Sequence, residues 1–417
     1  MSNGEVQPIH HEQFLHEFAQ DVGRAQSARL FAMQLELTPH DQGSAVLEAI
    51  CAVLKARGAG VDARVALDMR YAQAVTRVHN RDFPNWWPLL SPEQKERRRE
   101  NAAHTAKWIH ILTAADALQD SSPRRQSSSH ATRARIVASG HIAQHWAVAH
   151  QKGGVILHQN PERSSATLST GNLTTSDTKT MNNMAVTFTG IRGQHMGEVI
   201  MRLIEPGAPL RSAGGHVWQK DPNDWVTLFH DYNNVGDPAR LPFIHQAAEK
   251  LIDPERNEHI FDGALATPKP QTILYTSQYK PDGKLALMLS RAQAGGATVI
   301  VPKQPAEDYR VRSFPYSLQS FLPQSNQSNG LSAPERAKAS HVKSLVVRYH
   351  DNTAALLFGS DNYLTHIQKV VRNEEMAVLL KISPHAPEQV ATYNKYLATL
   401  LSLGELTPST IKELEMC

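Results

Sequence analysis

The sequence has little of what marks secreted or membrane-spanning proteins. It holds two cysteines in 417 residues, Cys51 and Cys417, too few and too far apart for a disulfide framework. Its longest apolar runs, such as 285–289 and 299–301, are far too short to cross a bilayer. The polar N-terminus lacks the apolar core of a signal peptide. We therefore expect a cytoplasmic protein.

Neither sign of charge is in strong excess. The 43 basic and 40 acidic residues give a net charge of +3. Proteins that bind nucleic-acid backbone usually show a clear basic excess, because phosphate neutralisation supplies most of their affinity. The charge balance therefore disfavours a nucleic-acid partner, although a local basic patch would still allow one. The length is sufficient for two packed cores of ordinary size.

Two stretches of the chain share a strand–helix–strand pattern. Their elements are strand 28–37, helix 43–57 and strand 61–68 in the first stretch, and strand 272–277, helix 283–293 and strand 297–302 in the second. A unit of this length implies a right-handed crossover onto a largely parallel sheet. The repetition predicts an α/β protein made of two related halves.

Each half also carries the same short motif, a His-x-Lys followed after a small-residue turn by an asparagine. The residues are His150, Lys152 and Asn172 in the first copy, and His341, Lys343 and Asn362 in the second. From histidine to asparagine the separation is 22 residues (150 to 172) and 21 residues (341 to 362). One His-x-Lys carries little information in a chain with 21 histidines. Two copies at matched spacing predict a shared function.

The chemistry of these residue types suits a phosphodiester. Residues two apart in a strand project from the same face, so the histidine and lysine of each motif should lie together. Facing halves would present two imidazoles, two ammonium groups and two amides to one anion. One histidine can attack phosphorus and the other can protonate the leaving alkoxide, while lysine and asparagine stabilise charge on the oxygens. We expect no metal or other cofactor, because the lysines supply the positive field.

These motifs resemble those of the phospholipase D superfamily, whose pattern is His-x-Lys-x4-Asp, a downstream Gly-Ser-x-Asn and a following acidic residue. The second copy matches well, with Gly359-Ser360-Asp361-Asn362 and then Glu375. The first copy is looser, with Thr170 and Asn172 in Ser-Thr-Gly-Asn and with Asn183 in the place of the acidic residue.

The aspartate of the family motif is missing from both copies. Leu157 and Arg348 stand in its place. By the resemblance that aspartate is chiefly structural, and the tyrosyl-DNA phosphodiesterase branch also lacks it. Its absence leaves the chemistry possible and the branch open.

The resemblance implies a fold and a division of the chain. The fold would be α/β, with two related halves, each a mixed β-sheet flanked by helices, packed around a shared central active-site cleft. The divisions would be an N-terminal helical segment at 1–27, a first half at 28–240 with a helical insertion at 71–135, and a second half at 241–417.

The resemblance also implies roles for the site residues. His150 would be the nucleophile that forms a phosphohistidine intermediate, and His341 would be the general acid. This assignment is a convention of the family, so the reverse remains open. Glu375 would orient one of the histidines. Thr170 and Ser360 would bind the substrate phosphate.

Three functions remain open. The first is a phospholipid-acting phosphatidyltransferase or phospholipase D, similar to cardiolipin synthases, that binds phospholipid and attaches peripherally to an anionic inner membrane face. The segment Met184 to Gly190 favours it, because it resembles a strand of bacterial cardiolipin synthases. The second is a metal-independent nuclease or DNA-end phosphodiesterase. The third is a degenerate, non-catalytic protein, which the presence of both histidines and both lysines disfavours.

Other segments allow a structural or a functional interpretation. His141 and His145 stand at the i, i+4 spacing of a metal pair, but no further ligand completes the set, so solvated histidines are favoured. Trp86-Trp87 would be the core of an inserted subdomain or a membrane-interface patch. The basic run Lys95 to Arg99 in a predicted helix 91–118 would be a solvated face or a contact for a polyanion.

Overall fold

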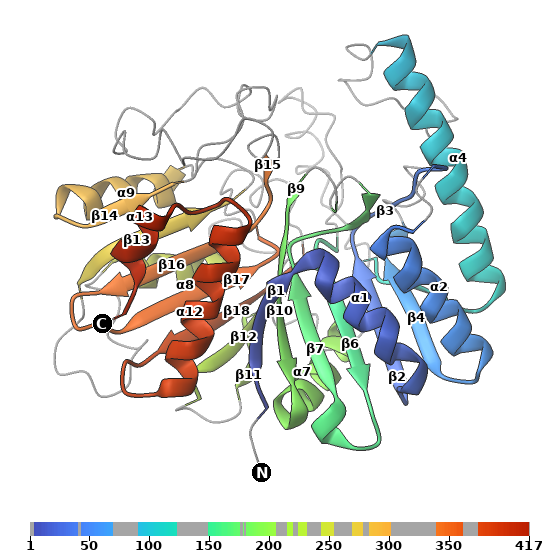
Figure 1. The fold of residues 1–417 in the computed structure, drawn as a ribbon, viewed down its shortest axis with the longest axis horizontal. Coiled ribbons are helices and arrows are strands. Elements are labelled where there is room, and N and C mark those ends of the chain that lie inside the picture. Colours follow the sequence, from blue (N-terminus) through green and yellow to red (C-terminus); the bar gives the residue numbers. More distant parts are fainter. Residues whose placement is uncertain are drawn as a thin grey trace, which may run out of the picture.

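Most strands of the described residues form two seven-stranded sheets (Figure 1). The structure, a computed structural model, describes residues 4–40, 43–69, 91–122, 149–175, 178, 181–205, 215–219, 224–231, 243–253, 269–277, 283–301, 339–361 and 374–416. The first sheet has the strand order β1-β10-β7-β6-β2-β4-β5, and the second has β11-β12-β18-β17-β16-β13-β14.

Five consecutive strands of one sheet correspond to five of the other. The strands of the first sheet are β1 (Val6–His10), β2 (Ser27–Ala32), β4 (Asp62–Leu67), β5 (Leu118–Asp120), β6 (Gly153–Leu157), β7 (Ser165–Ser169) and β10 (Met184–Thr189). Those of the second are β11 (Gly215–Gln219), β12 (Val226–Asp231), β13 (Pro270–Thr276), β14 (Thr298–Ile300), β16 (Ser344–Tyr349), β17 (Ala354–Gly359) and β18 (Glu375–Ile382). The order β10-β7-β6-β2-β4 matches β18-β17-β16-β13-β14 in sequence and direction. The prediction of two related α/β halves is confirmed.

The two crossover units form where the sequence pattern placed them. Helix α2 (Ala45–Gly58) joins β2 to β4, and helix α9 (Gly283–Ala294) joins β13 to β14. In both units the two strands pair in parallel. Ser44 begins α2 as its N-cap, because its side chain accepts a hydrogen bond from the Leu47 N–H.

The sheets differ from the sequence-based expectation in two details. The predicted strand 28–37 ends at Ala32, and a separate short strand β3 (Leu35–Glu36) pairs with β8 (Leu173–Thr174). The other neighbouring strands of the two large sheets pair antiparallel, except β4 with β5. The sheets are therefore mixed, as the resemblance implied, and not largely parallel as the crossover units alone suggested, because an antiparallel hairpin follows each crossover.

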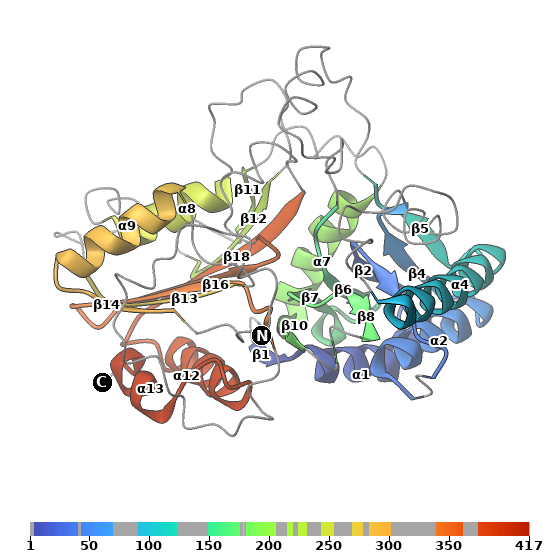
Figure 2. The same ribbon diagram turned by 90° about the horizontal axis from the view of Figure 1, so that it is seen from above.

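Helices cover both faces of each sheet (Figure 2). The helices are α1 (His11–Asp21) and α2 against α7 (Gly190–Ile204) in the first half, and α8 (Phe243–Ile252) and α9 against α12 (Pro387–Ser402) and α13 (Pro408–Leu414) in the second. Alternate residues of a strand enter different cores, as Leu30 joins the α1–α2 core and Phe31 the α7 side. The core on the α7 side continues to Tyr396 and Leu397 of α12, so the two halves share one hydrophobic core.

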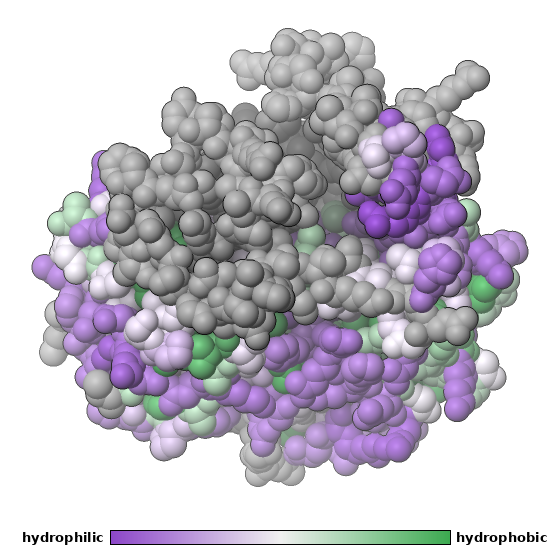
Figure 3. All heavy atoms as spheres, turned by 45° about the horizontal axis from the view of Figure 1, so that its top comes forward, coloured by the Kyte–Doolittle hydropathy of each residue, from purple (hydrophilic) through white to green (hydrophobic). Residues whose placement is uncertain are grey.

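Helix α4 (Pro92–Ala114) lies within the predicted helix 91–118 and projects from the body of the first half (Figure 1). It ends before Asp116, whose φ of 50° turns the chain into β5. None of the described helices is long and apolar enough to cross a membrane. On the face shown in Figure 3, hydrophobic side chains of the described part are scattered among hydrophilic ones. The run Lys95 to Arg99 on α4 is mostly exposed, and Arg99 lies 3.0 Å from Glu96.

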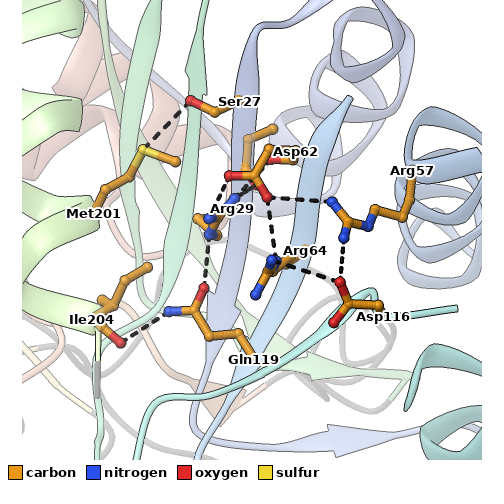
Figure 4. A network of polar contacts seen from close by, with 10 residues as sticks. Ser27, Arg29, Arg57, Asp62, Arg64, Asp116, Gln119, Met201 and Ile204 are labelled. Carbon is orange, nitrogen blue, oxygen red and sulfur yellow. Dashed lines mark hydrogen bonds and ion pairs between the residues drawn. The ribbon is translucent and has the colours of Figure 1, made fainter. Parts of the chain in front are cut away.

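A polar network links β2, β4 and β5 at one edge of the first sheet (Figure 4). Arg29 on β2 donates to Asp62 on β4 at 2.8 Å and to Gln119 on β5 at 2.8 Å. Burial raises the pKa of Asp62, but the guanidinium of Arg29, helped by Arg64 and Arg57, outweighs it and lowers that pKa. The network thus links three neighbouring strands through one buried arginine.

The sheets divide the chain at a different point from the expected boundary at 240. Strands β11 and β12 fall within the expected first half, yet β12 pairs with β18 in the second sheet. The segment 1–27 contains β1 as well as α1, and β1 pairs with β10. The second sheet therefore begins at Gly215 of β11, because β11 pairs with β12 and β12 pairs with β18.

Candidate functional site

The two His-x-Lys segments lie just before the corresponding strands β6 and β16, not within them. Each lysine side chain donates back to the carbonyl of its histidine, Lys152 Nζ to His150 O at 2.5 Å and Lys343 Nζ to His341 O at 3.0 Å. The expectation of paired side chains on one strand face is therefore replaced by this local hydrogen bond. It still holds each lysine against its histidine.

Each segment leaves its own sheet because its backbone bonds to the other half. The His150 N–H donates to Glu374 O at 2.9 Å, and the His341 N–H donates to Asn182 O at 3.0 Å. Strand β15 (Ala339–Ser340) pairs in parallel with β9 (Met181–Asn182). These exchanges bring the two motifs, far apart in sequence, to the junction between the sheets (Figure 1).

Each histidine side chain also contacts a residue of the other half. His150 Nδ1 lies 2.9 Å from the Glu375 carboxylate, and His341 Nδ1 lies 2.7 Å from Asn183 Oδ1. A carboxylate and an amide oxygen are acceptors, so Nδ1 of each imidazole is the donor. When such an imidazole is neutral, its lone pair is on Nε2.

A hydroxyl group completes each of these contacts. Ser360 donates to Glu375 Oε2, and Thr170 donates to Asn183 Oδ1 at 3.1 Å. The backbone repeats the symmetry, because Thr170 N bonds to Met184 O at 3.0 Å and Ser360 N to Met376 O at 2.9 Å. The two hydroxyls thus orient the cross-half partners, while their expected contact with a substrate phosphate stays a prediction.

The hairpins β6–β7 and β16–β17 return the chain to the site. Asn172 follows β7 and is buried, close to the turn of Thr170. Its counterpart Asn362 lies outside the described residues, as do His141, His145 and Trp86-Trp87. Hydrogen bonds join His150 and Ser360 through Glu375, and His341 and Thr170 through Asn183. Lys152 and Lys343 are held to their histidines, and Asn172 is buried after β7.

The site is buried but polar. The exposed fractions are 7% for His150, 5% for His341, 1% for Lys152 and 0% for Lys343. Burial lowers the pKa of His150, the Glu375 carboxylate opposes this, and Lys152 and Lys343 lower it further. The net pKa is below the usual value, so His150 is neutral around neutral pH. The influence of Lys343 also shows that charges from both halves act on one imidazole.

Sequence reasoning missed a second layer of buried polar residues behind the histidines. Gln151 Nε2 lies 3.0 Å from His230 Nε2, and His245 Nε2 lies 3.2 Å from Asp361 Oδ1. In the first half, His11 Nδ1 lies 2.8 Å from Ser169 Oγ. Asp361 stands within the quoted Gly-Ser-x-Asn motif, but nothing in the sequence singled out these histidines among the others.

The chain was compared with protein families, curated sequences and solved structures. No family model matches the chain, and no curated protein matches its sequence. The structure of phosphatidylserine synthase from Haemophilus influenzae Rd KW20 is similar over 99% of this chain and 92% of that chain, with 11% identity and a TM-score of 0.56. The chain therefore shares its overall fold with that synthase.

Two further solved structures have lower TM-scores against this chain. Polyphosphate kinase from Porphyromonas gingivalis has 15% identity and a TM-score of 0.46, with 93% of this chain covered. This chain spans 46% of that kinase. The phospholipase D family member Nuc from Salmonella typhimurium has 14% identity and a TM-score of 0.27. The match covers 48% of this chain and 91% of the Nuc chain.

Proposed function

We propose that this protein is a phosphodiesterase that works through a phosphohistidine on His150, and that its substrate is a phospholipid. The crosswise contacts of His150 with Glu375 and of His341 with Asn183 carry the proposal. They support a shared site with two imidazoles of unlike environment, which suits a nucleophile and an acid.

The difference between the partners assigns the roles. When His150 Nε2 bonds to phosphorus, positive charge develops on the imidazole, and the Glu375 carboxylate stabilises it. His341 has a neutral amide partner, which holds a proton less strongly than a carboxylate would. His341 is therefore the better proton donor, and His150 the better nucleophile.

The reaction has two balanced steps. First, the Nε2 lone pair of neutral His150 attacks phosphorus, the phosphorus–oxygen ester bond breaks, and the imidazolium of His341 gives its proton to the leaving alkoxide. Second, His341 takes a proton from water or an alcohol, whose oxygen attacks phosphorus while the phosphorus–nitrogen bond breaks. Lys152, Lys343 and Asn172 stabilise the non-bridging oxygens in both steps.

The phospholipid substrate is supported by two observations. The phosphatidylserine synthase fold matches nearly the whole chain. The net charge of +3 lacks the basic excess usual for proteins that bind nucleic acid.

Purified protein should be incubated in EDTA with vesicles of phosphatidylglycerol in one series and single-stranded DNA in another. We expect headgroup release or exchange from the lipid, no cleavage of the DNA, and loss of turnover in both His150→Ala and His341→Ala. Cleavage of DNA alone would replace the lipid substrate by the nuclease alternative. Full turnover by either alanine variant would show that the site lies elsewhere.

A further inference from the structure

A second buried imidazole–carboxylate pair lies beside the pair formed by His150 and Glu375. His245 Nε2, in the first turn of α8, lies 3.2 Å from Asp361 Oδ1 and 3.1 Å from Oδ2. Both side chains are almost inaccessible to solvent. Asp361 directly follows Ser360, whose hydroxyl donates to Glu375. One turn of chain therefore connects the two pairs.

Carboxylates from several elements face His245. They are Asp361 after β17, Asp231 at the end of β12 and Glu375 at the start of β18. Burial lowers the pKa of His245, but these three carboxylates outweigh it and raise that pKa. On α8 itself, Glu249 is buried one turn further along. His245 is thus biased toward its positively charged form.

The first half has no such charge at the equivalent place. His11 begins α1 and contacts the carbonyl oxygen of Asn172 at 3.2 Å. Gly171 stands where the second half has Asp361, and Asn183 stands where it has Glu375. Among the described residues, the carboxylates Asp361 and Glu375 of the second half thus have the uncharged counterparts Gly171 and Asn183 in the first.

We propose that His245 is a positioning residue that acts through Glu375 on His150. Paired with Asp361, its positive charge balances the carboxylates crowded there and keeps His150 neutral enough to attack. Without that cation, the surrounding negative charge would favour the imidazolium form of His150, which has no lone pair for phosphorus. The inference rests on the proposed function, because it requires His150 as the nucleophile.

The test is the pH profile of kcat/KM with bis(p-nitrophenyl) phosphate. This substrate has a leaving group that needs little protonation. The fall of kcat/KM at low pH, its acidic limb, therefore reports the pKa of the nucleophile in the free protein. In His245→Gln, an uncompensated carboxylate should move that limb to higher pH by about one pH unit. Asp361→Asn should move it to lower pH, and the double variant should return it close to the wild-type position.

A packing role would give another pattern. Each variant would then lose activity without moving the limb, and the double variant would be the most impaired. His11→Gln is the matched control in the other half and should leave the limb in place. If the limb stays fixed in both single variants, or if both move it in the same direction, the inference is overturned.

Failure of the inference and failure of the proposed function are separable. Turnover in His150→Ala would refute the proposed function. An inactive His150→Ala together with an unmoved limb in His245→Gln would refute the inference alone. Should the substrate not be turned over, an NMR titration of the His150 imidazole in wild type and in both single variants gives the same two shifts directly, and an unshifted titration overturns the inference.

Discussion

Replacing Glu375 with glutamine perturbs the proposed nucleophile most directly. The carboxylate lies 2.9 Å from His150 Nδ1, and the exposed side-chain fractions are 9% for His150 and 1% for Glu375. A hydrogen bond to a charged group contributes about 1.5–3 kcal/mol. Since about 1.4 kcal/mol is tenfold in rate, we expect kcat/KM to fall by about 10- to 100-fold.

The pH profile gives this variant a second signature. Glu375 raises the pKa of His150 against burial, so its removal lowers that pKa further. The acidic limb of kcat/KM should therefore move to lower pH while the maximum falls. The matched control is Glu100→Gln, which removes an exposed carboxylate on α4 and should change neither quantity. A loss below threefold, or a limb displaced to higher pH, would refute the role given to Glu375.

Two further predictions concern stability. Burial, opposed by hydrogen bonds from Asn182 and Ser340, raises the pKa of Glu405 to about 7. Its neutral form is favoured in the folded state. The contribution of Glu405 to the free energy of unfolding is therefore fully present below the unfolded pKa of 4.5 and is lost as pH rises through about 7. In urea unfolding, Glu405→Gln should therefore stabilise the protein by about 3 kcal/mol at pH 8 and have little effect at pH 4. Equal effects at both pH values would contradict this. Arg29→Met should cost about 2 kcal/mol of unfolding free energy at pH 7, because it leaves the buried Gln119 amide oxygen and the partly exposed Asp62 carboxylate without the Arg29 donor. A cost below about 0.5 kcal/mol would show that the network of Figure 4 does not stabilise the first half.

Much of the fold could be predicted because local patterns determine it. The apolar alternation and helical spacing around 28–67 and 270–300 give two crossover units, and each forms with parallel strands. The mixed character of the sheets depends on the antiparallel pairing of β2 with β6 and of β13 with β16, which joins strands far apart in sequence. The sheet to which β12 belongs could not be predicted, because its partner β18 is far along the chain.

The site could be predicted as a set of residues but not as a geometry. Repetition of the His-x-Lys motifs identified side chains that the structure gathers at one junction. It did not reveal that His150 contacts a residue of the other half, since that exchange depends on the backbone bond to Glu374. Nor could it reveal His245, because isolated histidines carry no signal until the fold brings a carboxylate such as Asp361 beside them.

Identifying the phosphorylated residue tests the central claim most directly. The His341→Ala variant, incubated with bis(p-nitrophenyl) phosphate, lacks the group that activates water, so the intermediate should accumulate. After a basic quench that preserves phosphohistidine, peptide mass spectrometry should find the phosphoryl adduct on His150. An adduct on another residue, or turnover in this variant with no adduct on His150, would contradict the account.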